Sequence, residues 1–328
     1  MTAERDEPRF WGVLPCIRSD YSRARLQFFA FLKFRHPLST ILLLCPESQV
    51  DWFREQIEEF EGRLDIRVVS ELEIVPELNE YTWVRGWVKQ QLLKLAAAPY
   101  VQSDFYVTLD ADVILRRDAT VADFVTEGRA KYALLDPTPH MTWYRGSWRV
   151  LGVPFRSEQR EHNVTPAILS RHAVLELIAF LEKRGAGIQS SWDPRTLIQR
   201  AILSRRSRYP EGTRLWTLLL ASFAIRRINE WTEYSMYYSF LEATGTLDRY
   251  HVEAEKALYD TAHSIRKRQA EAKFERLDWT EVFSQPADAE DPRPPFLIIQ
   301  SVSKVPLAKV LSTLAPLVDA PSDAASQR

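Results

Sequence analysis

Two aspartates separated by one residue, Asp110 and Asp112, directly follow an apolar run at residues 105–109. The run reads as a buried strand, and open α/β sheets bind ligands beyond the carboxyl ends of their strands. Two carboxylates at such a point can place oxygen atoms on one hard cation, and Mg²⁺ or Mn²⁺ usually takes few protein carboxylates together with substrate phosphates. The pair therefore predicts a divalent-cation site. Short acids at a strand end also make turn hydrogen bonds, so the pair by itself leaves both interpretations open.

The elements that would position this pair alternate between strand and helix. Apolar runs at 11–17, 41–45, 65–69 and 132–135 read as further strands, and helical patterns fall at about 47–60 and 120–127. Apolar residues also recur at helical spacing just before the aspartate pair, at Val84, Val88, Leu92 and Leu95. This alternation predicts an α/β fold with a mostly parallel sheet flanked by helices.

The pattern becomes more helical after the strand expected at 132–135. We expect residues 1–136 to form one half of a single domain and residues 137–318 a second half. Residues 319–328 read as a disordered tail. In the second half, an irregular stretch at 143–148 precedes a helix opening at Pro166 and running to Arg184. Further helices are expected at about 194–206 and 232–244, and a strand at 296–299.

Composition excludes several classes of protein. The formal net charge is -1, so no overall field favours nucleic acid as a partner. Cys16 and Cys45 lie in apolar runs, which suits reduced, buried thiols. The charged amino terminus has no apolar segment behind it, and the longest apolar run, 215–225, is too short to cross a bilayer. We therefore expect a cytoplasmic protein.

Four motifs in a fixed order resemble those of a known group of enzymes. They are Trp87-Val88-Lys89-Gln90-Gln91, Leu109-Asp110-Ala111-Asp112, Pro166-Ala167-Ile168-Leu169-Ser170-Arg171, and Trp231-Thr232-Glu233-Tyr234 with Tyr237. The chain resembles bacterial glycosyltransferases of the GT-A class over about residues 11–265. The resemblance implies a GT-A-like, Rossmann-like fold in which 1–136 binds a nucleotide sugar and the more helical 137–318 binds the acceptor.

The resemblance also implies an activity. A sugar would pass from a nucleoside-diphosphate sugar, with a UDP-sugar favoured, to a glycan or lipid-linked glycan such as lipopolysaccharide or surface polysaccharide, with Mn²⁺ or Mg²⁺ as cofactor. Basic runs at 200–208 and 266–268 are compatible with peripheral contact at the inner face of the plasma membrane, where lipid-linked acceptors reside. Solvated helix faces explain these runs equally well.

Donor contacts follow from the same resemblance. The loop after the first strand would hold the base and ribose through Arg18 and Asp20, although Asp20 also suits a turn or a helix cap. Arg85, Lys89 and Gln90 would contact the donor diphosphate or sugar beside Asp110. A solvated helix face is the alternative for these three.

An inverting transferase needs a carboxylate to take the proton of the acceptor hydroxyl. Glu233 fits this role in the first turn of a helix that Thr232 or Asn229 caps, but the helix dipole alone also favours an acid there. Asp136, after the expected strand at 132–135, is the rival candidate. A retaining enzyme would need neither as a base.

The remaining candidates complete the predicted site. His263 is the candidate third metal ligand, with His251 as its alternative. Trp143 and Trp148 are the candidates for acceptor contact, since sugar rings stack on indole, although tryptophans also fill cores. Three other functions stay open: a phosphatase of the haloacid-dehalogenase type, a nucleotidyltransferase using the same two aspartates, and a non-catalytic sugar-binding protein.

Overall fold

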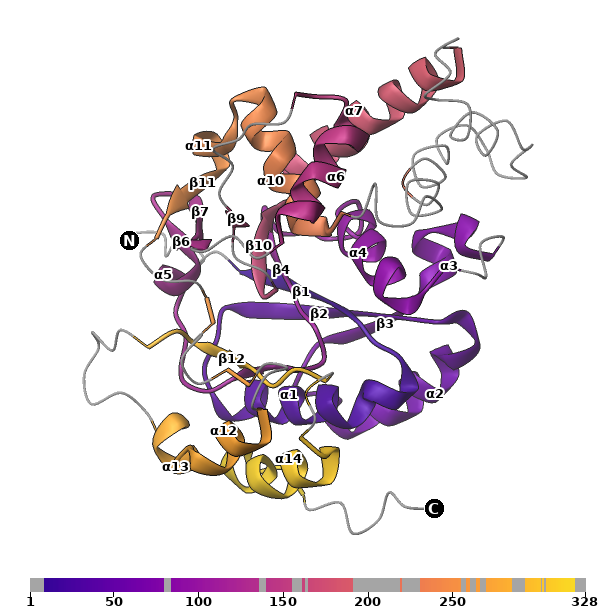
Figure 1. The fold of residues 1–328 in the computed structure, drawn as a ribbon. Helices are drawn as coiled ribbons and strands as arrows, with labels where there is room; N and C mark the ends of the chain where they lie inside the picture. The colour runs from indigo at the N-terminus through magenta and orange to yellow at the C-terminus, as the bar shows by residue number, and fades with distance from the viewer. Residues whose placement is uncertain are drawn as a thin grey trace, which may run out of the picture.

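The computed structural model describes residues 9–79, 84–135, 140–154, 161–162, 165–190, 219, 231–254, 258–259, 264–265, 270–284, 293–301, 303 and 305–321. These residues contain a central five-stranded sheet in the order β10-β4-β1-β2-β3 (Figure 1). Four of its strands are parallel: β1 (Phe10–Pro15), β2 (Leu38–Cys45), β3 (Ile66–Ser70) and β4 (Phe105–Thr108). The fifth, β10 (Ala167–Ser170), runs antiparallel to β4.

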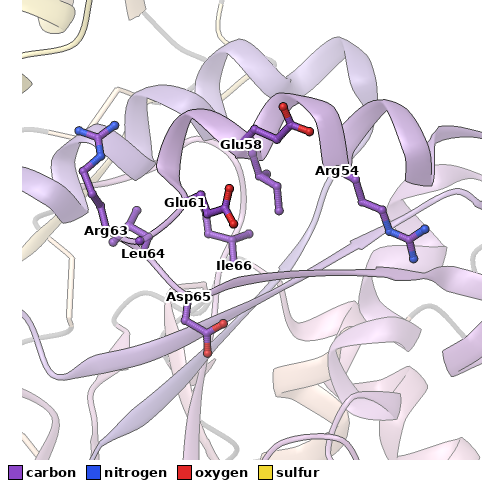
Figure 2. A pocket seen from close by; sticks show the side chains of 9 residues that line it. Arg54, Glu58, Glu61, Arg63, Leu64, Asp65 and Ile66 are labelled. Carbon is purple, nitrogen blue, oxygen red and sulfur yellow. The ribbon is translucent and has the colours of Figure 1, made fainter.

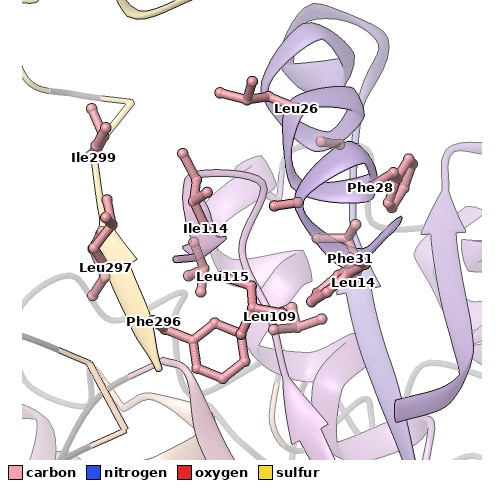
Figure 3. Close-up of a cluster of buried hydrophobic side chains, with 14 of the residues drawn as sticks. Leu14, Leu26, Phe28, Phe31, Leu109, Ile114, Leu115, Phe296, Leu297 and Ile299 are labelled. Atoms are coloured by element: carbon pink, nitrogen blue, oxygen red, sulfur yellow. The ribbon is translucent and has the colours of Figure 1, made fainter. Parts of the chain in front are cut away.

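Side chains on successive residues of the sheet enter two separate hydrophobic cores. In β2, Ile41 and Leu43 pack into one core, while Leu42 and Leu44 pack into the other. This two-sided burial explains why the strands read as unbroken apolar runs rather than alternating ones. Figure 3 shows part of the first core, where Leu14 of β1 lies beside Phe31 of α1, and Ile114 and Leu115 lie between α1 and the strand that carries Leu297.

Helices cover both faces of the sheet. Residues of α1 (Tyr21–Lys33), α2 (Val50–Ile57), α12 (Ala270–Arg276), α13 (Trp279–Val282) and α14 (Leu307–Leu314) enter the first core. The second core takes residues of α3 (Glu71–Ile74), α4 (Gly86–Ala96), α6 (Met141–Leu151), α7 (Arg171–Ser190), α10 (Glu233–Thr244) and α11 (Leu247–Tyr250). The α/β fold with a mostly parallel sheet flanked by helices is thus confirmed.

Short strands beside the main sheet bind distant parts of the chain together. β5 (Val113–Leu115) pairs antiparallel with β12 (Phe296–Ile298). β7 (Arg129–Tyr132) pairs with β6 (Val125–Thr126), which follows the short helix α5 (Val121–Phe124), and with β11 (His251–Glu253). β8 (Leu134–Leu135) pairs with β9 (Glu161–His162). Single 3-10 turns lie at Arg18–Asp20, Glu47–Gln49, Glu58–Phe60, Pro76–Asn79 and Ala315–Val318.

Two local predictions are wrong. The run at 132–135 does not enter the central sheet. Its residues belong to β7 and β8, which pair with the short strands β6, β11 and β9 instead. The fifth strand is instead Ala167–Ser170, where a helix opening at Pro166 was expected and where α7 begins only at Arg171. These residues form a strand rather than a helix because they are buried on both faces of the sheet: Ile168 enters one core and Leu169 the other.

The stretch at 143–148 is also not irregular. It lies within helix α6, in which Tyr144, Trp148 and Leu151 are buried at spacings of four and three residues, despite the interior Gly146. The helix expected at 232–244 is confirmed as α10, whereas the one expected at 194–206 lies outside the described residues. The division at residue 136 stays a prediction, and β10 from the second half joins the sheet of the first. Within the described part of the chain, no helix is long and apolar enough to span a membrane.

Candidate functional site

Asp110 and Asp112 lie in the turn that connects β4 to β5, at the carboxyl end of β4. The turn is held from below by Gln27 of α1, whose fully buried amide Nε2 donates to the carbonyl oxygens of Asp110, at 3.2 Å, and of Val113. The amide of Leu109 donates to the carbonyl oxygen of Val13 at 2.9 Å, which continues the pairing of β4 with β1 up to the motif. The backbone of the aspartate pair is therefore fixed from both sides.

Each aspartate has one oxygen engaged by the protein. Asp110 Oδ1 lies 2.7 Å from Nζ of Lys94, and Asp112 Oδ2 accepts the backbone N–H of Ser301 at 2.7 Å. No hydrogen bond from a described residue reaches Asp110 Oδ2 or Asp112 Oδ1. Carboxylate oxygens are the ligands that Mn²⁺ and Mg²⁺ prefer, so these two oxygens fit a divalent cation.

Lys94 connects the aspartate pair to Glu233. Its ammonium is 1% exposed and lies 3.0 Å from both Thr165 Oγ1 and Glu233 Oε1, in addition to its contact with Asp110. Burial alone lowers the pKa of Lys94, but the carboxylates of Asp110 and Glu233 outweigh it and raise that pKa above its usual value. Lys94 is therefore a charged link between two acids.

Glu233 occupies the first turn of α10, which begins after the N-cap Thr232. The Thr232 hydroxyl accepts the N–H of Ser235 at 3.2 Å, and the Glu233 N–H donates to Gln91 Oε1 at 3.3 Å. Oε1 of Glu233 is engaged by Lys94 and by the Thr165 hydroxyl at 3.0 Å. The second oxygen, Oε2, is buried and has no hydrogen-bond partner among the described residues.

These carboxylates share one small cavity of about 170 Å³. One wall is aromatic: the ring of Trp143 lies 5.9 Å from Trp87 and 6.0 Å from Tyr234, and it stacks on His140 at 4.0 Å. Thr165, Ile298 and Gln300 also reach the cavity. The full lining is Trp87, Gln91, Asp110, Asp112, His140, Trp143, Thr165, Thr232, Glu233, Tyr234, Ile298 and Gln300.

The site has a concentrated negative charge. Burial, followed by the neighbouring charge of Asp110, raises the pKa of Asp112 to about 6, against the opposing effects of the Ser301 N–H, Arg23 and Lys94. Burial also raises the pKa of Asp20, with Arg23 opposing and Asp110 adding to the rise. Asp20 and Arg23, at the start of α1, thus lie within electrostatic range of the aspartate pair.

The structure brings together four of the predicted site residues, namely Asp110, Asp112, Glu233 and Trp143. The proposed donor residues outside the cavity have other contacts or none that the structure describes. Arg18 lies over the ring of Trp52 at 4.8 Å, and Lys89 pairs with Glu71 at 2.7 Å. Arg85, Gln90 and the buried Trp148 do not line the cavity either.

Two further predicted residues, Asp136 and His263, lie outside the described residues. The alternative metal ligand, His251, is buried among aromatic rings, where its Nε2 lies 2.7 Å from the hydroxyl of Tyr237. Among the described residues, no group of three or more His, Cys, Asp or Glu side chains is arranged to hold a metal. The candidate ligands that the described residues offer are therefore the two aspartates.

Sequence reasoning missed several residues that line the cavity or contact its carboxylates. Trp87, Gln91 and Lys94 share one face of α4, and their spacings of four and three residues would have revealed it. A lysine within the apolar run 92–96 is a further signal, because a buried ammonium needs carboxylate partners. No sequence signal connects His140 or Gln300 with this cavity.

A second, larger hollow of about 690 Å³ lies between the end of α2 and the start of β3 (Figure 2). Arg54, Glu58, Glu61, Arg63 and Asp65 give it mixed charge. None of the residues around the aspartate pair lines it, and it contains no convergent set of catalytic groups.

Comparisons with known proteins give remote structural similarities. The chain is similar to mouse xyloside xylosyltransferase 1 in its apo form, with 8% identity, a TM-score of 0.45 and coverage of 91% of this chain and 100% of that one. It is similar to the glycosyltransferase GlyE of Streptococcus pneumoniae TIGR4, with 11% identity, a TM-score of 0.43 and coverage of 97% and 66%. A third similar structure is glucosyl-3-phosphoglycerate synthase of Mycobacterium tuberculosis in complex with Mn²⁺, UDP and glucosyl-3-phosphoglycerate, with 15% identity, a TM-score of 0.30 and coverage of 51% and 58%.

Among curated proteins, none matches this sequence. One family profile does match, over residues 13–321, and it is that of the family of unknown function DUF6492. The match spans nearly the whole chain, and the protein therefore belongs to the DUF6492 family.

Proposed function

We propose that this protein is a metal-dependent glycosyltransferase that moves a sugar from a nucleoside-diphosphate sugar to a glycan or lipid-linked glycan. The observation that carries the proposal is that Asp110 and Asp112, at the carboxyl end of β4, face the same cavity as the buried carboxylate of Glu233. A candidate cation site and a candidate base thus line one cavity, with Lys94 in contact with both.

The aspartate pair would hold Mn²⁺ or Mg²⁺ through Asp110 Oδ2 and Asp112 Oδ1, the oxygens that no described donor reaches. A cation bound there supplies Lewis-acid neutralisation of the leaving diphosphate. The Ser301 N–H and the Lys94 ammonium orient the two carboxylates through their other oxygens. The nucleotide is a UDP in our proposal.

Glu233 is the proposed base. Lys94 and Thr165 engage Oε1, so the unpartnered Oε2 is the atom that would take the proton of an acceptor hydroxyl. The Gln91 amide oxygen fixes the first turn of α10 by accepting the Glu233 N–H.

The charge around the cavity supports a cation followed by an anionic donor. Three acids line it, namely Asp110, Asp112 and Glu233, and Lys94, Asp20 and Arg23 act on this group electrostatically. Together these six side chains carry two formal negative charges in excess. A divalent cation balances that excess, and its own charge then becomes the strongest local attraction for a diphosphate.

The cavity volume of about 170 Å³ is below the roughly 300 to 1,000 Å³ of clefts that enclose a whole ligand of drug size. The described walls therefore suit the reacting sugar, with the nucleotide extending beyond them. The aromatic wall formed by Trp87, Trp143 and Tyr234 suits the apolar face of that sugar or of the acceptor. A cytoplasmic protein acting on lipid-linked acceptors at the inner face of the plasma membrane completes the proposal.

Nucleotide binding is tested by thermal unfolding with UDP, GDP, CDP and ADP, each with and without 1 mM Mn²⁺, a concentration of about the magnitude that such weak sites require. We expect one nucleotide to raise Tm only when Mn²⁺ is present, and Asp112→Asn to abolish that rise. Asp51→Asn is the matched control, because the Asp51 side chain is 98% exposed on α2. If no nucleotide gives a metal-dependent rise, the proposal is wrong.

Turnover is tested by release of the nucleoside diphosphate from the matching nucleotide sugars. Glu233→Gln should lower kcat by about 10² to 10⁴ while leaving the Mn²⁺-dependent rise in Tm. Release that needs no metal, or that Glu233→Gln leaves unchanged, would contradict the assigned roles.

A further inference from the structure

The cavity contains a histidine whose orientation is set by a fully buried acid. Glu161, in β9, has a side chain that is 0% exposed. Its Oε2 accepts the backbone N–H of His140 at 3.0 Å, and its Oε1 lies 2.8 Å from Nδ1 of the same residue. Both oxygens of this carboxylate therefore serve His140, and the described residues offer them no other hydrogen bond.

The two contacts have different consequences. The contact with the backbone N–H lies at the start of α6, where an acid is favourable because of the helix dipole. The contact with Nδ1 does not stabilise the helix, but it fixes the orientation of the imidazole ring. An ionised carboxylate can only accept, so with Glu161 ionised Nδ1 carries the hydrogen, and the ring in its neutral form then presents Nε2 as an acceptor.

The ring of His140 is partly enclosed and partly open to the cavity. One ring face of His140 is covered by Trp143, at a centroid distance of 4.0 Å and an interplanar angle of 2°. Nδ1 is engaged by Glu161, yet the side chain is 36% exposed and lines the cavity. Trp87 extends the same wall and is 40% exposed, a large open surface for an indole.

We propose that His140, Trp143 and Trp87 form a carbohydrate subsite in which His140 Nε2 accepts a hydrogen bond from a sugar hydroxyl while the indoles cover the apolar face of the ring. The proposal deepens the proposed transferase and rests on it for the identity of the sugar as an acceptor. An Nε2 without hydrogen accepts from a hydroxyl but not from a fully ionised phosphate oxygen, which has nothing to donate. The subsite therefore selects the sugar end of a substrate over the diphosphate end.

Binding is measured by saturation-transfer NMR with the methyl glycosides of glucose, galactose, mannose and N-acetylglucosamine, in the presence of Mn²⁺ and UDP. We expect at least one glycoside to bind and His140→Phe, which keeps a stacking ring, to weaken it three- to tenfold. His172→Phe is the matched control, because His172 makes a similar pair with Glu176 at 3.2 Å on the exposed face of α7. If none of these glycosides binds, or if both variants weaken binding equally, the proposal is overturned.

The direction of the hydrogen bond gives a test that a structural role would not affect. Monofluoro derivatives of the glycoside that binds replace one hydroxyl at a time by a group that cannot donate. One position should lose affinity in the wild-type protein and lose none in His140→Phe. Loss at the same positions in both proteins would overturn the proposal.

The hydrogen on Nδ1 is observed directly by long-range ¹H–¹⁵N NMR of the histidine rings. We expect His140 to be in the Nδ1–H form, and assignment of its ring to the Nε2–H form would overturn the proposal. The outcome of these experiments is independent of the test of the transferase. Glycoside binding through His140 without Mn²⁺-dependent nucleotide binding would support the subsite and contradict the proposed function. The reverse result would keep the function and lose the subsite.

Discussion

The ammonium of Lys94 lies 3.0 Å from Oε1 of Glu233, and both side chains are 1% exposed. A buried ion pair of this kind contributes little net stability compared with apolar residues, but removing one partner leaves an uncompensated charge in the interior. Lys94 also contacts Asp110, so one ammonium balances two acids that come from β4 and α10.

Replacing this ammonium is expected to be severely destabilising. Lys94→Met keeps the length of the side chain but leaves Glu233 and Asp110 without their cation, so the free energy of unfolding should fall by about 3 to 5 kcal/mol. Urea unfolding measures the change. Lys33→Met is the control, because Lys33 pairs with the exposed Asp319 at the surface and should cost no more than about 1 kcal/mol. If both variants lost the same free energy of unfolding, burial of the Lys94 ion pairs would not increase the cost of removing the ammonium.

The amide of Gln27 should matter for metal binding as well as for stability. Gln27→Met removes the donor to the carbonyl oxygens of Asp110 and Val113, so we expect a loss of about 1 to 2 kcal/mol in urea unfolding. The rise in Tm with Mn²⁺ and UDP should shrink in the same variant, because the turn that positions the carboxylates loosens. Gln49→Met, at a surface contact with the backbone of Arg18, should change neither quantity.

Acid should destabilise the fold through His251. Burial lowers the pKa of His251 to about 3, well below the value near 6.5 of an exposed imidazole. Between these two values the unfolded chain binds a proton that the folded protein does not, so the stability is complete above pH 6.5 and declines as pH falls. The contribution is up to about 1.4 kcal/mol per pH unit.

Urea unfolding at pH 7, 6 and 5 checks the contribution of this imidazole. His251→Gln can retain a hydrogen bond to the hydroxyl of Tyr237 and should flatten the dependence of stability on pH. His172→Gln, on the exposed face of α7, controls for the loss of an imidazole. A slope that both variants leave unchanged would rule out His251 as its source.

Both thiols should be unreactive in the folded protein. Cys16 is 2% and Cys45 1% exposed, and both are free. Burial raises the pKa of each thiol, that of Cys45 to about 12, so little thiolate is present at pH 8. Ellman's reagent should therefore detect neither thiol in native buffer and both in urea. Rapid reaction of a thiol in native buffer would contradict the burial of these two strand ends.

The central strands could be predicted because their residues are apolar on both faces. The runs that became β1, β2, β3 and β4 are long enough and isolated enough to be recognised individually. β10 was mistaken for the start of a helix because four apolar or small residues directly before an amphipathic helix do not reveal a change of element. Its antiparallel place beside β4 depends on contacts across about sixty residues, which local patterns do not contain.

The site was predictable to a similar degree. Asp110, Asp112 and Glu233 were predicted from motifs and Trp143 from its aromatic side chain, and all four line one cavity. On α4 the sequence predicted Lys89 and Gln90, which stay predictions, whereas Gln91 lines the cavity and Lys94 contacts Asp110 and Glu233. The pairing of Glu161 with His140 could not be predicted from the sequence, because it depends on how β9 and the start of α6 meet in space.

The hydrogen bond from the Ser301 N–H to Asp112 joins residues 189 positions apart, and β12 pairs with β5 beside it. The motif that begins the site is therefore translated long before the strand that secures it. A growing chain that has emerged only as far as α10 contains both aspartates and Glu233, but it lacks the backbone donor that orients Asp112. The chain must be translated through Ser301 before this contact can form, so the two carboxylates would reach their final arrangement well after their own strand has been made.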